Sequence, residues 1–470
     1  MADTRRRKSS KPAVPAPGSP PSPPVPAAGG EALLSLREKC GKVLGTNLVP
    51  DIAEYLDTCF TGIELKGALP LQYVFGMNIL PVGKFIMIVG PPSSYKSALL
   101  YWCMGLFMRA QGLGYYMETE NKPNTDLLQA IINDRELLMN SFVPVYDKNN
   151  PATQEKIFQG IRQLGLDYPG LMKTVGYQVP ILIGLDSIGS MQSEAMLNRI
   201  CNPTAAQVRD GQDVNLVGYS AMHAASNIKG WLQGMITRYV SRYPILLMAV
   251  NHESAADAGF SSMDDGGGEE GGGKFGGPVQ GGRFAPGQSG LKPTTGGRAK
   301  EFLASGRIGM QASMAKETQT SNIRTIYMRT DKNSIGVQHQ SKLPIPFVTE
   351  FSRNGTSNRA YFDWDTALVD LLLSAKTPKV MQADLIGLAA GSNGRVSCKK
   401  LGLTGPIAEV GAALHADPEC VRLIQDILGI ARKPIVGQKP TTIGEEPADA
   451  ESGGEAAQGD GAVESESSSE

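Results

Sequence analysis

A lysine and a hydroxyl at the end of a short polar loop are the residues best suited to chemistry in this chain. The loop runs through Gly90, Pro91, Pro92, Ser93, Ser94, Tyr95, Lys96 and Ser97. It follows the phosphate-binding pattern G-x-x-x-x-G-K-[ST], with Tyr95 in place of the second glycine. Such loops turn backbone N–H groups toward phosphates at the N-terminus of a helix. We therefore expect Lys96 to reach the β- and γ-phosphates of a nucleotide and Ser97 to ligate Mg²⁺. A chance match in a structural turn is the alternative.

Carboxylates follow two apolar runs elsewhere in the chain. Asp186 comes after 181–185, and Glu118 and Glu120 come after 114–117. Asp186 is a candidate for ordering Mg²⁺ or one of its waters. One of the two glutamates is a candidate for orienting the water that attacks a γ-phosphate, since hydrolysis needs such a group. The alternatives are a helix cap at Asp186 and a solvated acidic turn at the glutamates.

The elements that must hold these residues alternate between short apolar runs and helical patterns. Residues 85–89 predict a strand, and 98–108 predict a helix directly after the loop. Further strands, each followed by a polar residue, are predicted at 114–117, 181–185 and 245–250. In a doubly wound α/β fold, ligand-binding groups lie just beyond the carboxyl ends of parallel strands. The sequence thus predicts a large α/β domain with a mostly parallel, twisted sheet.

Composition excludes several classes of protein. The 470 residues are 41% hydrophobic and 19% charged, which is enough apolar material for a packed core. The six cysteines include no C-x-x-C pair, which argues against a disulfide scaffold and a structural zinc site. No apolar run approaches the roughly 20 residues of a membrane-spanning helix, and no apolar segment follows the basic residues 5–8 as in a secretory signal. We expect a cytoplasmic protein without a membrane partner.

Charge and composition divide the chain into five parts. The first two are a disordered, basic and proline-rich leader at 1–30 and a helical segment at 31–60. The α/β core at 61–375 follows, and then a small C-terminal domain of mainly helical composition at 376–440 and a disordered acidic tail at 441–470. The tail holds nine Asp and Glu and no Lys or Arg. We interpret it as a competitor for a basic groove, as a docking site for an accessory protein, or as a solvated end.

Several blocks of the sequence resemble RecA-type strand-exchange recombinases in their order and spacing. The blocks lie at 67–71, 80–97, 116–120, 185–189, 249–252 and 294–305. The resemblance covers roughly residues 60–370 and implies a RecA-like P-loop NTPase core. Tyr95 in the loop and the pair Asn251-His252 resemble the bacteriophage branch of this family, the UvsX group.

The resemblance also implies catalytic roles for three residues. Lys96 contacts the phosphates, and Glu120 matches the carboxylate that activates water. His252 matches a sensor of the γ-phosphate, which couples the state of the nucleotide to the DNA-binding loop that begins beside it.

A second set of residues is implied to contact the nucleotide of a neighbouring subunit. Lys332 matches a basic residue that reaches that ATP across a filament interface. Ser334 stands where the bacterial members of the family have a second lysine. The residue that completes the contact with the neighbouring ATP therefore stays open, and Arg329 is a candidate substitute.

A glycine-rich insertion at 253–293 is the expected DNA-binding loop. Cations there would neutralise phosphates, and phenylalanine rings would stack on unpaired bases. The predicted DNA contacts are Lys274, Phe275, Arg283, Phe284, Lys292 and Arg298, with Arg209 in a second loop. The alternatives are a non-functional disordered insertion and an ordinary surface loop around Arg209.

The resemblance implies an ATP-dependent DNA recombinase. Such a protein forms a filament on single-stranded DNA, pairs it with homologous double-stranded DNA and exchanges strands, with ATP and Mg²⁺ held between subunits. Single-strand-binding and mediator proteins are further candidate partners, and the cytoplasm of a bacterial host is the expected location if a phage encodes the chain. Two alternatives stay open: a RecA-fold DNA-binding paralogue or recombinase regulator that hydrolyses ATP weakly, and a hexameric helicase-type motor.

Overall fold

The computed structural model describes residues 61–120, 123–145, 153–194, 197, 228–252, 303–318, 320–336, 342–352, 357–374 and 386–436. All of them belong to the second of the two units into which the chain divides, 1–59 and 60–470. Four of the predicted segments lie outside the described residues, namely the leader, the helical segment 31–60, the insertion 253–293 and the tail 441–470.

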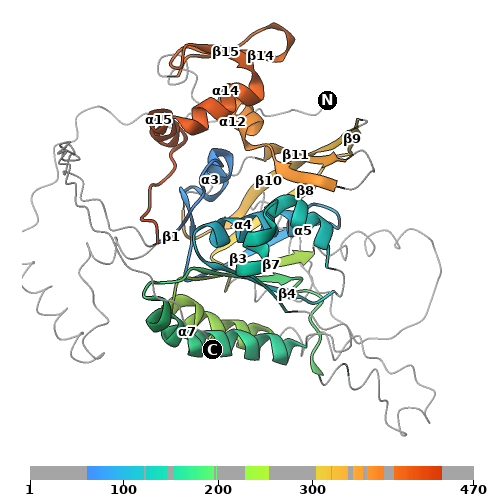
Figure 1. The fold of residues 1–470 in the computed structure, drawn as a ribbon, viewed down its shortest axis with the longest axis vertical. Coiled ribbons are helices and arrows are strands. Elements are labelled where there is room, and N and C mark those ends of the chain that lie inside the picture. The colour runs from blue at the N-terminus through green and yellow to red at the C-terminus, as the bar shows by residue number, and fades with distance from the viewer. Residues whose placement is uncertain are drawn as a thin grey trace, which may run out of the picture. The chain divides into compact units, whose positions relative to one another are not determined.

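A sheet of ten strands forms the centre of the described part of the chain (Figure 1). Its order is β12-β11-β10-β8-β3-β7-β6-β4-β5, with β9 paired to β10. Six strands run parallel, namely β3 (Lys84–Gly90), β4 (Leu113–Glu118), β5 (Phe142–Val145), β6 (Ile181–Asp186), β7 (Ile245–His252) and β8 (Gly306–Ala312). The antiparallel strands are β9 (Lys316–Glu317), β10 (Ser321–Asn333), β11 (Leu343–Phe351) and β12 (Ser357–Phe362). The predicted α/β fold with a mostly parallel sheet is confirmed.

Alternate residues of the central strand β3 face two different helix layers, as the two-residue period of a strand requires. Ile86 and Ile88 are buried with apolar residues of α4 (Lys96–Arg109) and α5 (Thr125–Ile132). Phe85 and Met87 are buried with residues of α7 (Gln154–Val175) and of the helical stretch 228–238. Figure 1 shows α4 and α5 on one side of the sheet and α7 on the other. Strands covered on both faces are apolar along their length, which explains the continuous apolar runs in the sequence.

The predicted elements around the loop are also present. The strands expected at 85–89, 114–117, 181–185 and 245–250 lie within β3, β4, β6 and β7, and the helix expected at 98–108 lies within α4. Each observed element exceeds the prediction by no more than two residues at either end.

The C-terminal part of the described chain packs on the core through helices. Helix α14 (Ile407–Ala416) contacts α12 (Trp364–Leu373), and α15 (Pro418–Leu428) contacts α3 (Leu69–Phe75). A three-stranded antiparallel sheet precedes α14 and consists of β13 (Leu388–Ala390), β14 (Arg395–Cys398) and β15 (Leu403–Pro406). The region with mainly helical composition therefore also contains strands.

Several short elements complete the fold. They are β1 (Gly62–Glu64) paired with β2 (Ile79–Pro81), helix α6 (Arg135–Ser141), and 3₁₀ helices at Val240–Arg242 and Ser392–Gly394. Across the described ranges, no helix combines the length and the apolar character that a membrane crossing requires.

Candidate functional site

The carboxyl ends of β3, β4, β6 and β7 meet at one cavity of about 400 Å³. The cavity is lined by the loop that follows β3 and by the residues that end the other three strands. The predicted residues among its lining are Ser93, Ser94, Tyr95, Lys96, Ser97, Glu118, Glu120, Asp186 and His252. Residues that end four strands thus surround one space, although up to 159 positions of sequence separate them.

The loop from Gly90 to Lys96 is shaped by its backbone. Gly90 ends β3, and a Cβ atom there would lie 2.2 Å from the carbonyl oxygen of Met310, so only glycine fits. Ser93 and Tyr95 have φ angles of 60° and 64° in the left-handed region. These conformations curl the loop so that α4 begins at Lys96.

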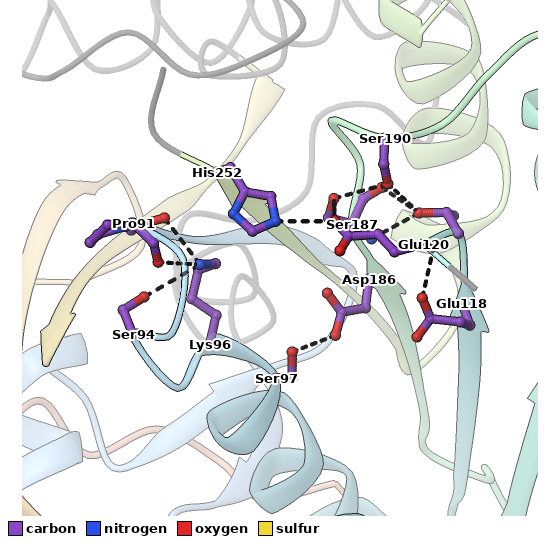
Figure 2. A network of polar contacts seen from close by, with 12 residues as sticks. Pro91, Ser94, Lys96, Ser97, Glu118, Glu120, Asp186, Ser187, Ser190 and His252 are labelled. Atoms are coloured by element: carbon purple, nitrogen blue, oxygen red, sulfur yellow. Dashed lines mark hydrogen bonds and ion pairs between the residues drawn. The ribbon is translucent and has the colours of Figure 1, made fainter. Parts of the chain in front are cut away.

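The ammonium group of Lys96 lies inside this curl. It donates to the carbonyl oxygens of Gly90 at 3.0 Å and of Pro91 at 2.7 Å, and to Ser94 Oγ at 3.3 Å (Figure 2). The residue is only 5% exposed. Pro92, by contrast, is exposed at the tip of the loop. A single positive charge is therefore fixed at the start of a helix, where anions bind favourably.

Ser97 and Asp186 form the second feature of the cavity. Ser97 Oγ donates to Asp186 Oδ2 at 2.5 Å, which joins the first turn of α4 to the end of β6. Burial raises the pKa of Asp186, and the hydrogen bond from Ser97 opposes that shift. A hydroxyl beside a carboxylate is an oxygen pair suited to Mg²⁺, which is bound through one or two such groups together with phosphates. Within the described ranges, no cluster of three His, Cys, Asp or Glu side chains is arranged to hold a metal.

Replacing Asp186 by asparagine is expected to stabilise the ligand-free protein near neutral pH. Because burial raises the pKa of Asp186, the folded carboxyl binds a proton more tightly than the unfolded one. Its stabilising contribution is therefore present in acid and is lost as the pH rises through the folded-state pKa. Asparagine keeps an oxygen for the Ser97 hydrogen bond but carries no charge.

The expected increase in melting temperature for Asp186→Asn is about 2–4 °C near pH 7, shrinking as the pH falls toward about 4. Thermal unfolding without Mg²⁺ across this range measures it. A lower melting temperature for the variant near pH 7 would show that the buried charge does not destabilise the fold.

Two buried tyrosines separate the roles of Glu118 and Glu120. Tyr101 OH donates to Tyr116 OH at 3.1 Å, and Tyr116 OH donates to Glu118 Oε2 at 2.7 Å. Burial raises the pKa of Tyr101 to about 12 and that of Tyr116 well above its usual range, so both hydroxyls keep their protons. Glu118 Oε1 also accepts the backbone N–H of Glu120 at 2.8 Å. Glu118 is therefore a buried positioning residue, whereas Glu120 is 31% exposed toward the cavity.

Glu120 connects the end of β4 to the ends of β6 and β7. Its Oε1 lies 3.0 Å from His252 Nε2 and accepts a hydrogen bond from Ser187 Oγ at 2.7 Å. Ser190 Oγ lies 3.0 Å from Ser187 Oγ, and Thr119 Oγ1 donates to the Ser187 carbonyl at 2.8 Å (Figure 2). The hydroxyls hold Ser187 in place, and Ser187 in turn orients the Glu120 carboxylate.

The residues expected to reach a neighbouring subunit lie away from this cavity. Lys332 pairs with Arg307 in the sheet register, and Arg307 pairs with Met87, three residues before the loop begins. Arg329 Nε lies 2.6 Å from Oδ1 of the buried Asp331. Among the described residues, neither Arg329 nor Lys332 belongs to the cavity lining.

Ser334 makes a structural contact with the residue that precedes β8. Its Oγ donates to the carbonyl oxygen of Ser305 at 2.8 Å, and its backbone N–H donates to the same oxygen at 2.9 Å. The predicted DNA contacts fall outside the described residues, namely Arg209, Lys274, Phe275, Arg283, Phe284, Lys292 and Arg298.

Sequence reasoning missed two groups of residues in the site. Tyr116 lies two positions before Glu118, and this i, i+2 spacing on a strand is a signal that would have placed both on one face. Arg324, on β10, also lines the cavity. Its sequence neighbourhood carries no motif, because its position depends on the register of β10.

The site carries a buried cation, a hydroxyl–carboxylate pair and a glutamate–histidine pair within one cavity. This set can bind a polyphosphate with a divalent cation and can orient a water molecule. Neither the models of known protein families nor the curated proteins include a match to this chain.

Proposed function

We propose that the protein is a RecA-like P-loop NTPase acting as an ATP-dependent DNA recombinase, which forms filaments on single-stranded DNA and promotes homologous pairing and strand exchange. The observation that carries the proposal is the convergence of Lys96, the Ser97–Asp186 pair and the Glu120–His252 pair on one cavity. The sequence blocks that resemble RecA-type recombinases support the DNA part of the proposal.

Each group in the cavity suits one part of ATP hydrolysis. Lys96 and the backbone N–H groups at the start of α4 would hold the β- and γ-phosphates. Ser97 and Asp186 would hold Mg²⁺, which supplies charge neutralisation on the phosphate oxygens when it is bound. Glu120 would orient the attacking water and accept a proton from it. The hydrogen bond from Ser187 keeps the Glu120 carboxylate in one orientation.

The Glu120–His252 contact supports a link between hydrolysis and DNA binding. His252 is the last residue of β7, and the glycine-rich insertion begins directly after it. A change in charge at Glu120 acts on the imidazole 3.0 Å away and, through it, on the start of the insertion. The cations and phenylalanines of the insertion would hold the DNA backbone and bases with little sequence preference.

The position of Lys332 suits a contact with a different subunit. Its strand register places it level with Met87 in the middle of β3, three residues before the loop of its own chain begins. In a head-to-tail filament, a side chain that does not line the nucleotide cavity of its own subunit would be able to meet the nucleotide of the next.

A second candidate is a DNA-binding paralogue that hydrolyses ATP weakly. The observation in its favour is that the second cation of the contact between subunits lacks a suited residue: Ser334 stands at its position and binds the Ser305 carbonyl, and the candidate substitute Arg329 is paired with the buried Asp331. The rate of DNA-stimulated ATP hydrolysis separates the two candidates.

The affinity for single-stranded DNA, measured with and without nucleotide, tests the proposal. Fluorescence anisotropy of a labelled oligonucleotide should show tighter binding with Mg²⁺ and a non-hydrolysable ATP analogue, and electron microscopy should show extended filaments only under that condition. Equal affinity and equal assembly with and without the analogue would overturn the proposal.

A further inference from the structure

An aromatic residue of the loop and an arginine of the sheet lie next to each other in the lining of the cavity. The ring centroid of Tyr95 lies 4.7 Å from that of Phe347, and Arg324 Cζ lies 5.7 Å from the Tyr95 ring centroid. Arg324 and Phe347 are directly opposite each other on β10 and β11. Directly opposite residues on antiparallel strands project from the same face of the sheet, so both side chains meet the Tyr95 ring together.

Tyr95 has an unfavourable backbone conformation for its side chain. Its φ angle of 64° lies in the left-handed region, where a bulky residue is uncommon and the phosphate-binding pattern has glycine. Backbone strain of this kind persists when the surrounding structure fixes it, and it clusters at ligand sites. The ring that replaces glycine here packs between the sheet and the cavity.

Arg324 carries unused hydrogen-bonding capacity into the same cavity. Its Nε is buried, and no residue that the structure describes accepts a hydrogen bond from it. Arg324 lines the cavity, and its Cζ lies over the Tyr95 ring within cation–π distance. A guanidinium placed beside an aromatic ring in this way is preorganised, because little conformational freedom is lost when its plane or its N–H edge contacts a ligand.

The sheet order separates Arg324 from the end of the cavity suited to phosphate and Mg²⁺. Asp186 is on β6 and Arg324 is on β10, and each strand lies two positions from β3, on opposite sides. With adjacent strands about 4.8 Å apart, β6 and β10 are about 19 Å apart across the sheet. The loop with Lys96 lies between them, so a polyphosphate whose Mg²⁺ is held at Ser97 and Asp186 has room to extend past Lys96 toward Arg324.

We propose that Arg324, placed over the ring of Tyr95, contacts the nucleobase of a nucleoside triphosphate bound in the same subunit. The inference rests on the proposed nucleotide site and adds a residue that sets affinity for the nucleoside portion. It also gives Tyr95 a purpose, since a glycine at this position would leave Arg324 without the ring that orients it.

Calorimetric titration with two ligands, ATP and inorganic tripolyphosphate, each with Mg²⁺, tests this assignment. Arg324→Gln should weaken ATP binding about tenfold and leave tripolyphosphate binding unchanged. Arg324→Lys keeps the charge but lacks a planar group, so it should lose most of the same ATP affinity with less effect on folding. Arg359→Gln is the matched control, because Arg359 stacks on Tyr361 with its Cζ 4.6 Å from the ring centroid and lies outside the cavity lining.

The outcomes separate this inference from the proposed function. Unchanged ATP affinity in both Arg324 variants, or equal weakening of ATP and tripolyphosphate, would overturn the nucleobase contact while leaving the nucleotide site standing. If the wild-type protein bound neither ligand, the proposed function would fail and the inference with it. Selective weakening of ATP, with the Arg359→Gln variant unaffected, supports both.

Discussion

Replacing Glu120 by glutamine is expected to slow DNA-stimulated ATP hydrolysis by about 10²- to 10⁴-fold. The amide has nearly the shape of the carboxylate, and its oxygen can still accept the hydrogen bond from Ser187 Oγ, now 2.7 Å from Glu120 Oε1. It cannot accept a proton from the attacking water. Phosphate release at saturating ATP and single-stranded DNA measures the loss, and nucleotide affinity should change little because Lys96, Ser97 and Asp186 are untouched.

The Glu120→Gln variant should also hold single-stranded DNA for longer in the presence of ATP. If hydrolysis releases DNA, a variant that binds ATP but turns it over slowly stays in the DNA-binding state. Glu317→Gln is the matched control, because Glu317 is an exposed glutamate on β9 and its rate should equal that of the wild type. If the Glu120→Gln variant hydrolysed ATP at a rate within tenfold of the wild-type rate, Glu120 would not be the general base, and the neighbouring Glu118 would be the candidate for that role.

The core strands could be predicted because parallel strands buried on both faces leave a plain signal. All six residues of β6 are buried, and the five residues before Asp186 form an uninterrupted apolar run. The strands β13, β14 and β15 leave no such signal. They contain three or four residues each, and their sequences, LAA, RVSC and LTGP, include few large apolar side chains. Their conformation is decided by tertiary packing against the neighbouring helices, and the pattern of apolar and polar residues in the sequence does not indicate such packing.

The phosphate end of the candidate site could be predicted for a related reason. Asp186 and His252 end their strands, and Lys96 follows the end of its strand within one short loop. The carboxyl edge of a parallel sheet brings such residues together whatever their separation in sequence. The opposite end of the cavity depends on antiparallel pairing. Arg324 reaches it only because β10 pairs with β11 in a register that places it opposite Phe347, and no local motif specifies that register.

The resemblance assigns the catalytic role to Glu120, but the residues alone do not separate it from Glu118, and the physical reason for preferring Glu120 required the structure. Both glutamates follow the same apolar run, and their spacing gives them equal claims to the catalytic role. The hydroxyl of Tyr116 decides between them, since it donates to Glu118 and leaves Glu120 to contact His252. To make this choice from the sequence, one would have to predict that the Tyr116 side chain is buried beside Glu118. That burial depends on the helix packed over β4.

Replacing Lys96 by alanine is expected to lower the rate of ATP hydrolysis by about 10²- to 10³-fold and to remove the effect of ATP on DNA affinity. Lys96 holds the only ammonium group within the lining of the described cavity, and the oxygens that now accept its hydrogen bonds belong to the loop itself. Alanine leaves those carbonyls in place but removes the charge that would attract phosphates. Steady-state hydrolysis and oligonucleotide anisotropy, each with and without ATP, measure the two effects.

The DNA measurement is the sharper of the two, because contamination by another ATPase cannot imitate it. Lys342→Ala is the matched control, since Lys342 is exposed, donates to Gln311 Oε1 at 3.3 Å and lies outside the cavity lining. Its DNA affinity should still rise when ATP is added. If the Lys96→Ala variant also bound DNA more tightly with ATP, the nucleotide that acts on DNA would have to bind elsewhere. The loop after β3 would then be a structural turn. This is the alternative raised by Tyr95, which stands where the phosphate-binding pattern has its second glycine.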